Sequence, residues 1–205
     1  MEFIDGDIYE DPFLPDNEPK ERKKIYESLA NTLGQLHSYN INKLDIPFKK
    51  NSGFMIRNLN IWYNQIFHEG YQDKDISEIY DFVIKNTPEN NNLCLLHGDY
   101  KLDNLVIGSN SKCLAVLDWE LSAFGEPEVD LSFQMINWLI PKGVLYGIGL
   151  EWESHHIPSA QEFLSSYEKT YGKMVNVETL NIYCLFSLMK LYCILKGIEN
   201  RIKAG

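Results

Sequence analysis

The chain has 205 residues, 44% of them hydrophobic and 23% charged, and its formal net charge is −10. This composition is typical of a globular protein with enough residues for one substantial core. The acidic balance argues against nucleic acid as a partner, since the densest basic run, residues 20–24, is predicted to be a solvated helix face. No apolar run reaches the roughly 18 residues that predict a membrane span.

The N-terminus and the cysteines predict where the protein works. The first residues are acidic and lack the basic and apolar regions of a secretory signal. The four cysteines form no C-x-x-C pair and fall in apolar segments, which is typical of reduced core thiols. We therefore expect a reducing location, the cytoplasm or the interior of an organelle, and not secretion.

The first half of the chain predicts a loop followed by three helices. Three prolines indicate an extended loop over residues 11–19. Apolar residues at spacings of three and four then predict a helix over about 18–38, and a second helix is expected over 54–67. A third helix is predicted over 75–86, where Asp75 is the expected N-cap.

The stretch Leu93–Trp119 is the most informative part of the sequence. It reads L-C-L-L-H-G-D-Y-K-L-D-N-L-V-I-G-S-N-S-K-C-L-A-V-L-D-W. Its three apolar runs, 93–96, 105–107 and 113–117, are too short for helices and predict strands. The last two runs flank a turn-forming cluster at 108–112, which predicts a hairpin.

Polar side chains follow these predicted strands. A hairpin would bring Asp99, Asn104 and Asp118 towards one another, and their hard oxygen atoms suit Mg²⁺. The spacing H-x-D-x-x-x-x-N, followed by an aspartate after the next hairpin, matches the catalytic loop and the metal-binding aspartate of kinases. Each residue alone would be ordinary turn chemistry. The complete spaced set favours a catalytic site over that simpler interpretation.

The second half of the chain is predicted to be helical. A helix is expected from Pro127 to about Ile140. Ser159 begins a capping box for the next helix, which Gly172 should end. The last helix is predicted over about 177–203, and because it is apolar on most faces we expect it to be buried.

Two polar residues of these helices have an ordinary interpretation. Asp130 interrupts an apolar face as a first-turn acid, worth under about 1 kcal/mol to the helix dipole. His37 lies at the end of the first predicted helix, where positive charge is favoured.

Three motifs of the chain resemble the aminoglycoside phosphotransferase (APH) family, which also includes choline, fructosamine and homoserine kinases. They are L-H-G-D-Y-K-L-D-N, A-V-L-D-W-E-L-S and G-E-P-E-V-D-L. The motifs have H-G-D and D-W-E where protein kinases have H-R-D and D-F-G. The chain is most similar to the phosphotransferase domain found beside, or fused to, acyl-CoA dehydrogenases. The resemblance runs through most of the chain, from D-P-F-L-P at 11–15 to Gly197 and Arg201.

The resemblance implies a site that uses ATP and Mg²⁺. Asp99 would be the catalytic base for a small-molecule hydroxyl, and Asn104 and Asp118 would be the Mg²⁺ ligands. The residues expected to support this site are His97, Asp103 and Asp130. The resemblance raises a second interpretation of Asp130, as a buried brace of the catalytic loop, and of His37, as a partner of the same loop.

The resemblance also implies an acceptor site beside the helix predicted over 54–67. Arg57, Trp62 and Glu120 are the expected substrate-binding residues, although a tryptophan at helical spacing is more often part of the core. The closer likeness favours a hydroxylated acyl-CoA or a similar metabolite as the acceptor. A dehydrogenase is the protein partner to expect.

The implied fold class is α+β, a protein-kinase-like fold with a mostly helical C-terminal lobe and a small β-hairpin catalytic region. We expect one domain over 1–205, with 1–15 as the interlobe linker and 16–205 as the C-terminal lobe. No Gly-rich phosphate-covering loop and no strand lysine precede the motif. The β-rich N-terminal lobe is therefore expected to be missing. The alternative is a non-catalytic remnant that serves as a binding domain.

Overall fold

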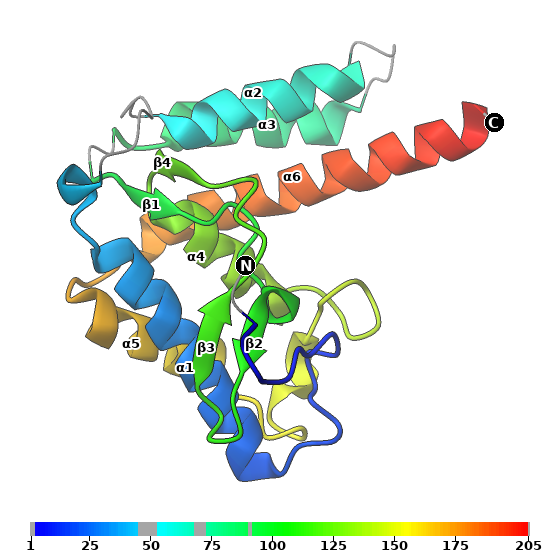
Figure 1. The fold of residues 1–205 in the computed structure, drawn as a ribbon. Coiled ribbons are helices and arrows are strands. Elements are labelled where there is room, and N and C mark those ends of the chain that lie inside the picture. The colour runs from blue at the N-terminus through cyan, green and yellow to red at the C-terminus, as the bar shows by residue number, and fades with distance from the viewer. Residues whose placement is uncertain (1–2, 45–52, 68–72, 90–91, 205) are drawn as a thin grey trace.

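The computed structural model describes residues 3–44, 53–67, 73–89 and 92–204 (Figure 1). The first two residues of the predicted linker therefore lie outside the described residues. The fold consists mainly of helices, with two small antiparallel strand pairs. The helices are α1 (Pro19–Ser38), α2 (Phe54–Phe67), α3 (Lys74–Asn86), α4 (Glu128–Met135), α5 (Ala160–Tyr171) and α6 (Val177–Ala204), and the strands are β1 (Cys94–Leu96), β2 (Leu105–Ile107), β3 (Cys113–Val116) and β4 (Ala123–Gly125).

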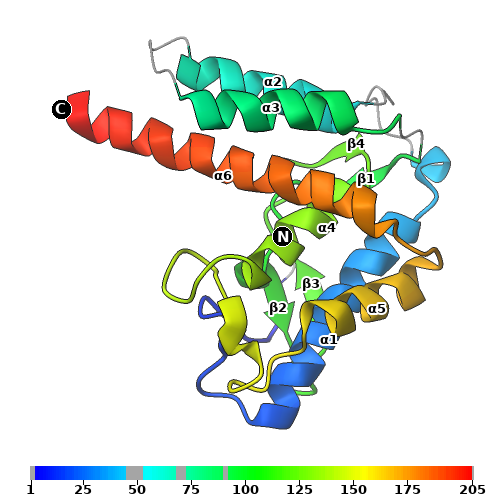
Figure 2. The same ribbon diagram turned by 180° about the vertical axis from the view of Figure 1, so that it is seen from behind.

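The helices form two groups with the strands between them. In Figures 1 and 2, α2 and α3 lie side by side on the long helix α6, while α1 and α5 pack against each other in the lower part of the molecule. Helix α4 lies under α6, and the hairpin β2–β3 lies against α1. The C-terminus is at the end of α6, which projects beyond the rest of the chain.

Two hydrophobic cores flank the loop that follows β1. The first core lies between α1 and α5, and the second lies between α2, α3 and α6. Leu96 at the end of β1 is fully buried in the second core, whereas Tyr100 is fully buried in the first. Burying a large apolar side chain contributes about 1.5–3 kcal/mol. The intervening loop, His97–Asp99, is therefore anchored firmly at both ends.

The strand pairs confirm the predicted hairpin and add one strand. In the hairpin, Leu105 is opposite Val116, and the register shifts after Val106. The structure also pairs β1 with β4, so that Leu96 is opposite Ala123. The sequence A-F-G of β4 is too short to show an alternating pattern, so only its distant partner identifies it as a strand.

The helix boundaries follow local signals closely, with one correction. Asp73 is the N-cap of α3, and its Oδ1 accepts hydrogen bonds from the backbone of Asp75 and Ile76. The prediction that Asp75 is the cap was therefore wrong by two residues. The capping box of Ser159 is present, and Gly172 ends α5 in the left-handed conformation at φ 78°, as predicted.

Helix α4 is shorter than predicted, and a backbone carbonyl just beyond it bonds to a later segment of the chain. It ends at Met135 and continues only as a 3₁₀ turn. In a longer α-helix the carbonyl of Asn137 would accept a hydrogen bond from residue 141, which is a proline and has no N–H. That carbonyl instead accepts from Ile148, 2.7 Å away.

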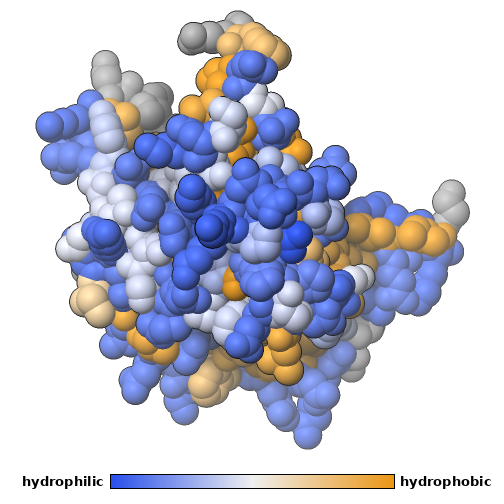
Figure 3. Space-filling model, turned by 90° about the horizontal axis from the view of Figure 1, so that it is seen from below, coloured by the Kyte–Doolittle hydropathy of each residue, from blue (hydrophilic) through white to orange (hydrophobic). Residues whose placement is uncertain are grey.

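Helix α6 is less buried than its composition predicted. Its first half packs on α2, α3 and α4, but Leu195, Ile198 and Ile202 on its second half are exposed. Figure 3 shows hydrophobic atoms along this projecting segment, beside a lower face that is mostly hydrophilic. The segment Val177–Lys203 is long and apolar enough to span a membrane by length and composition alone, and 33% of its most apolar window is buried.

Candidate active site

The loop after β1 is held by a buried carboxylate. Asp130, in the first turn of α4, is 1% exposed. Its Oδ2 accepts a hydrogen bond from the backbone of His97 at 2.7 Å, and its Oδ1 accepts one from Gly98 at 2.9 Å. Burial raises the pKa of Asp130. His37 and these two N–H groups lower it by more than burial raises it, so the pKa lies below its usual value. The carboxylate therefore stays ionised under the loop.

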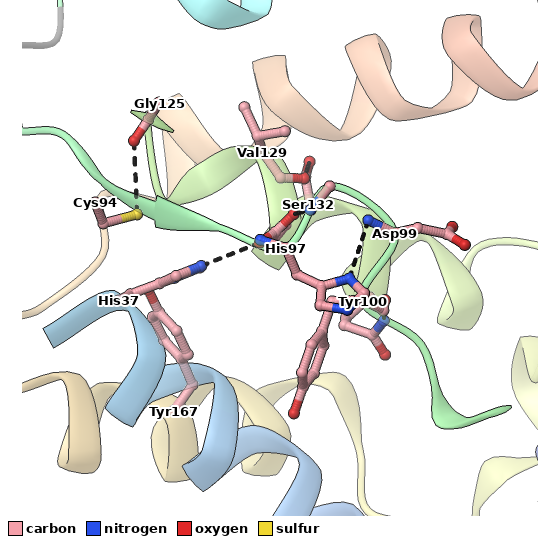
Figure 4. Close-up of polar contacts among 12 residues, drawn as sticks. His37, Cys94, His97, Asp99, Tyr100, Gly125, Val129, Ser132 and Tyr167 are labelled. Atoms are coloured by element: carbon pink, nitrogen blue, oxygen red, sulfur yellow. Dashed lines mark hydrogen bonds and ion pairs between the residues drawn. The ribbon is translucent and has the colours of Figure 1, made fainter. Parts of the chain in front are cut away.

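His37 connects this carboxylate to the first core. Its Nε2 lies 3.4 Å from Oδ2 of Asp130, and its Nδ1 lies 2.8 Å from the hydroxyl of Tyr167. Figure 4 shows His37 with Tyr167 next to it. A carboxylate only accepts hydrogen bonds, so Nε2 carries the proton that it shares with Asp130, while Nδ1 forms the bond to the hydroxyl of Tyr167. Of the two interpretations of His37, the structure shows contact with the residue that braces the loop.

His97 connects the loop to the end of β3. Its Nε2 donates to the carbonyl of Leu117 at 2.7 Å, and its Nδ1 accepts from the backbone of Asp99 at 3.3 Å. The ring also lies against Trp119, with centroids 4.9 Å apart. The two segments that carry the predicted base and the predicted metal-binding aspartate are therefore fixed relative to each other.

Asp99 is half-buried and its carboxylate is oriented. Nδ2 of Asn104 donates to the backbone carbonyl of Asp99 at 2.9 Å and to its Oδ2 at 3.3 Å. In Figure 4 the carboxylate points away from the rings of His97 and Tyr100. It is 28% exposed, so a small molecule can reach it.

Asn104 and Asp118 are neighbours because of a backbone hydrogen bond. The N–H of Leu117 donates to the carbonyl of Asn104 at 2.8 Å. Asp118 follows directly, is exposed and has a left-handed φ of 60°, which is uncommon outside glycine. Within the described residues no three His, Cys, Asp or Glu side chains form a metal cluster. Magnesium needs only one or two protein ligands, so a metal here would use oxygen atoms of Asn104 and Asp118 together with ligands from outside the chain.

Two further residues, which the sequence did not single out, complete the surroundings of Asp99. Nζ of Lys101 lies 3.4 Å from Oδ2 of Asp99 and 3.3 Å from Oδ2 of Asp103. Burial lowers the pKa of Lys101, but Tyr146 and the two carboxylates raise it above its ordinary value. Tyr146 donates to Asp103 at 3.1 Å, and Oδ1 of Asp103 is buried without a hydrogen-bond partner.

The predicted acceptor residues lie on two other segments of the chain. Arg57 and Trp62 lie on α2, which packs on α6 and α3, and Glu120 is exposed in the turn after Asp118. The polar partners of Asp99 within the described residues all come from its own loop. The role of these three residues therefore stays a prediction.

The start of α2 is fixed by a residue that the sequence did not reveal. Glu126 is 2% exposed and accepts hydrogen bonds from the backbone N–H groups of Gly53, Phe54 and Met55 at 2.6–3.3 Å. A carboxylate is favoured at a helix N-terminus. Its position just before α4 gave no sign of this, because the contact spans about 70 residues of sequence.

Comparisons with known proteins agree with this geometry. Residues 1–155 match the APH phosphotransferase enzyme family. The chain is 33% identical over 210 residues to acyl-CoA dehydrogenase family member 11 of Homo sapiens, an alignment covering 100% of this chain and 27% of that protein. The chain therefore spans about a quarter of the length of this relative.

Solved structures have the same fold. A crystal structure from Ralstonia eutropha JMP134, provisionally assigned as an aminoglycoside phosphotransferase, is 28% identical with a TM-score of 0.91, covering 100% of this chain and 64% of that one. Aminoglycoside phosphotransferase APH(3'')-Id of Streptomyces rimosus, in complex with ADP and streptomycin, is 13% identical with a TM-score of 0.54, covering 85% of this chain and 65% of that one. The predicted α+β, protein-kinase-like fold class is confirmed. With a family match over most of its length, the chain belongs to the APH phosphotransferase enzyme family.

Proposed function

We propose that this chain carries the phosphoryl-transfer site of a kinase that moves the γ-phosphoryl group of ATP to the hydroxyl of a small molecule. One observation carries the proposal. Asn104 bonds to Asp99 through its side chain and to Leu117 through its backbone. A base and two oxygen ligands are thereby gathered around one loop, as phosphoryl transfer requires.

Asp99 is the base in this reaction. Its Oδ2 is engaged by Lys101 and Asn104, whereas none of the described residues bonds to its Oδ1, which is left for the acceptor hydroxyl. The hydroxyl oxygen bonds to the γ-phosphorus while the bond from phosphorus to the β,γ-bridging oxygen breaks. ADP leaves with that electron pair, and the hydroxyl proton moves to Asp99.

Asn104 and Asp118 are the residues that would hold Mg²⁺. Both side-chain hydrogen bonds of Asn104 come from its nitrogen, so its oxygen is available to a cation. The exposed carboxylate of Asp118 supplies a charged ligand. A bound magnesium ion would neutralise phosphate charge, and it ordinarily completes its octahedron with water and phosphate oxygens. The ADP complex of the Streptomyces rimosus relative supports an adenine nucleotide as the donor.

For the acceptor we propose a hydroxyacyl-CoA-like metabolite. The dehydrogenase relative supports an acyl substrate. Leu139, Val144 and Leu145 are also exposed on the segment that carries Tyr146, and Tyr146 bonds to Lys101 beside the base. Apolar side chains at this position would suit the hydrocarbon chain of such an acceptor.

We also propose that residues 3–15 lead to a second lobe that covers the nucleotide. Asp7 pairs with Ile107 through two backbone hydrogen bonds of 2.8 Å, so the N-terminal segment runs along β2. Phe3 and Ile8 are exposed there, as are Trp119 and Leu121 after the hairpin. A covering lobe or a dehydrogenase partner would bury these apolar groups.

Calorimetry of Mg·ATP binding is the first test. We expect binding to the purified protein, and a loss of at least about tenfold in affinity for Asp118→Asn. Asp81→Asn, an exposed aspartate of α3, is the matched control and should bind normally. If the folded protein does not bind Mg·ATP, the kinase proposal fails and the binding-domain alternative replaces it.

The acceptor is tested by following ADP release. The protein is incubated with Mg·ATP and a series of hydroxyacyl-CoA thioesters that differ in hydroxyl position. The same acyl-CoA without a hydroxyl is the control, and streptomycin is the competing acceptor. We expect turnover only with a hydroxylated thioester. Turnover with streptomycin instead would overturn the acceptor assignment and leave the kinase assignment standing.

A further inference from the structure

Lys190 is a basic residue beside the catalytic loop that the proposed mechanism does not yet use. It lies in the middle of α6 and is half-buried. Its Nζ donates to the backbone carbonyl of Gly98 at 3.3 Å, the residue directly before Asp99. The ammonium also lies over the ring of Phe133, 5.4 Å from its centroid. The charge is therefore held at a fixed place next to the base.

This lysine differs from the other half-buried lysines in having no ion pair. Lys101 is paired with two aspartates, and Lys196, on the same helix, is 2.8 Å from Glu199. Among the described residues no carboxylate lies within ion-pair distance of Lys190. Burial lowers the pKa of Lys190 to below its usual value, and Asp99 and Asp130 raise it by less than burial lowers it.

A half-buried ammonium without an ion-pair partner is unfavourable for folding, because the more distant carboxylates of Asp99 and Asp130 offset only part of its desolvation. Such groups are commonly found where a ligand supplies the missing charge. An ammonium group has three N–H donors, and Gly98 accepts from one of them. The remaining donors are available to oxygen atoms that come close to Asp99.

We propose that Lys190 binds an oxyanion that a substrate brings next to Asp99. The shared chemistry is a phosphoryl or carboxylate oxygen, since hydrogen bonds from an ammonium to such oxygens are strong. Two sources can supply it, the phosphate groups of the nucleotide or an acidic group of the acceptor. Which of these two molecules supplies the oxyanion rests on the proposed kinase function. Its test measures binding and needs no turnover, so the two can fail separately.

The experiment observes the lysine directly. The protein is labelled with ¹³C at the lysine ε-carbons, and the NMR signal of Lys190 is identified by its loss in Lys190→Met. Inorganic phosphate, acetate and Mg·ATP are titrated separately against the wild type. We expect the Lys190 signal to move with phosphate or with acetate. Movement with phosphate and Mg·ATP assigns the nucleotide as the source, and movement with acetate alone assigns the acceptor.

Variants separate binding from a structural role. Calorimetry should show about tenfold weaker binding of the effective anion to Lys190→Met and partial recovery in Lys190→Arg. Lys196→Met, which removes a paired lysine six residues further along the same helix, should bind as the wild type does. We expect Lys190→Met to unfold at a temperature no lower than the wild type. A Lys190 signal that none of the three probes moves, or equal affinities in Lys190→Met and wild type, would overturn the proposal.

Discussion

The ammonium nitrogen of Lys101 lies 3.4 Å from Oδ2 of Asp99, and both side chains are half-buried. Tyr146 and Asp103 hold the same ammonium from the other side. The lysine keeps its proton because these partners raise its pKa despite its burial. One oxygen of the proposed base is therefore fixed by a permanent cation, and the other can be presented to a hydroxyl.

Replacing Lys101 by methionine should slow phosphoryl transfer. The side chain keeps its length but loses the charge that orients Asp99, and misplacing a reacting group by about 1 Å can reduce a rate by about 100-fold. We expect kcat to fall by at least about tenfold, while the KM for ATP changes little. The measurement is steady-state kinetics of ADP release. Lys112→Met, an exposed lysine of the hairpin turn, is the control, and an unchanged kcat in Lys101→Met would refute the prediction.

Gly98 is required by geometry at the start of the catalytic loop. Its φ is +87°, and a Cβ atom at this position would overlap the carbonyl oxygen of Leu121. We expect Gly98→Ala to lower the free energy of unfolding by about 2–5 kcal/mol, the sum of about 1–2 for left-handed strain and about 1–3 for overpacking.

A second glycine separates these two effects. Gly143 has a φ of +82° and nothing within 4 Å of its Cβ position. Gly143→Ala should therefore show only the strain, about 1–2 kcal/mol. Urea denaturation of both variants at constant m-value measures the difference. Equal losses of stability in the two would show that the contact with Leu121 relaxes without cost.

Local signals explain why much of the fold could be predicted from the sequence. The capping box of Ser159 and the left-handed Gly172 place α5 to within a residue, since each depends only on neighbours in the chain. The hairpin at 105–116 was equally local. The motif residues Asp99, Asn104 and Asp118 follow predicted strands or turns, so local signals were enough to place them.

The remaining features depend on contacts between distant segments. Tyr146 reaches Lys101 across 45 residues, and Lys190 reaches Gly98 across 92. Neither side chain stands in a periodic pattern that would identify its partner. Asp130 shows the same limit, because a first-turn acid looks alike in sequence whether it caps its own helix or braces another loop.

Replacing Asn104 by aspartate should separate metal binding from loop geometry. The variant keeps a side-chain oxygen for Mg²⁺ but loses the N–H donor to Asp99. It also places a second negative charge about 3.3 Å from the carboxylate of the base. We expect Mg²⁺ to support ATP binding at least as well as in the wild type, while kcat falls by at least about tenfold because the base is misplaced.

Magnesium titrations of ATP binding and of ADP release measure the two effects separately. Asn86→Asp is the matched control, since the Nδ2 of Asn86 donates to the carbonyl of Phe82 at 2.8 Å on an exposed helix face. It should change neither measurement. Loss of Mg²⁺-dependent binding in Asn104→Asp would contradict the proposed split between the two roles.

Replacing Asp130 by asparagine tests the brace under the catalytic loop. An amide has one oxygen, so one of the N–H groups of His97 and Gly98 would face an NH₂ group and lose its acceptor. Removing one partner from a buried charged network is expected to lower the free energy of unfolding by about 3 kcal/mol. Glu178→Gln removes an exposed first-turn acid of α6 and should lower it by under about 1 kcal/mol.

The pH dependence of this difference has a definite sign. Burial raises the pKa of Asp130, but His37 and the two backbone N–H groups lower it to below its unfolded value. Such a group contributes stability that is present above the unfolded pKa of about 3.9 and is lost as the pH falls through the folded pKa. The difference in the free energy of unfolding between wild type and Asp130→Asn should therefore be largest near pH 7 and become smaller below about pH 4. A gap of constant size in urea denaturation across this range would show that Asp130 braces the loop without its charge.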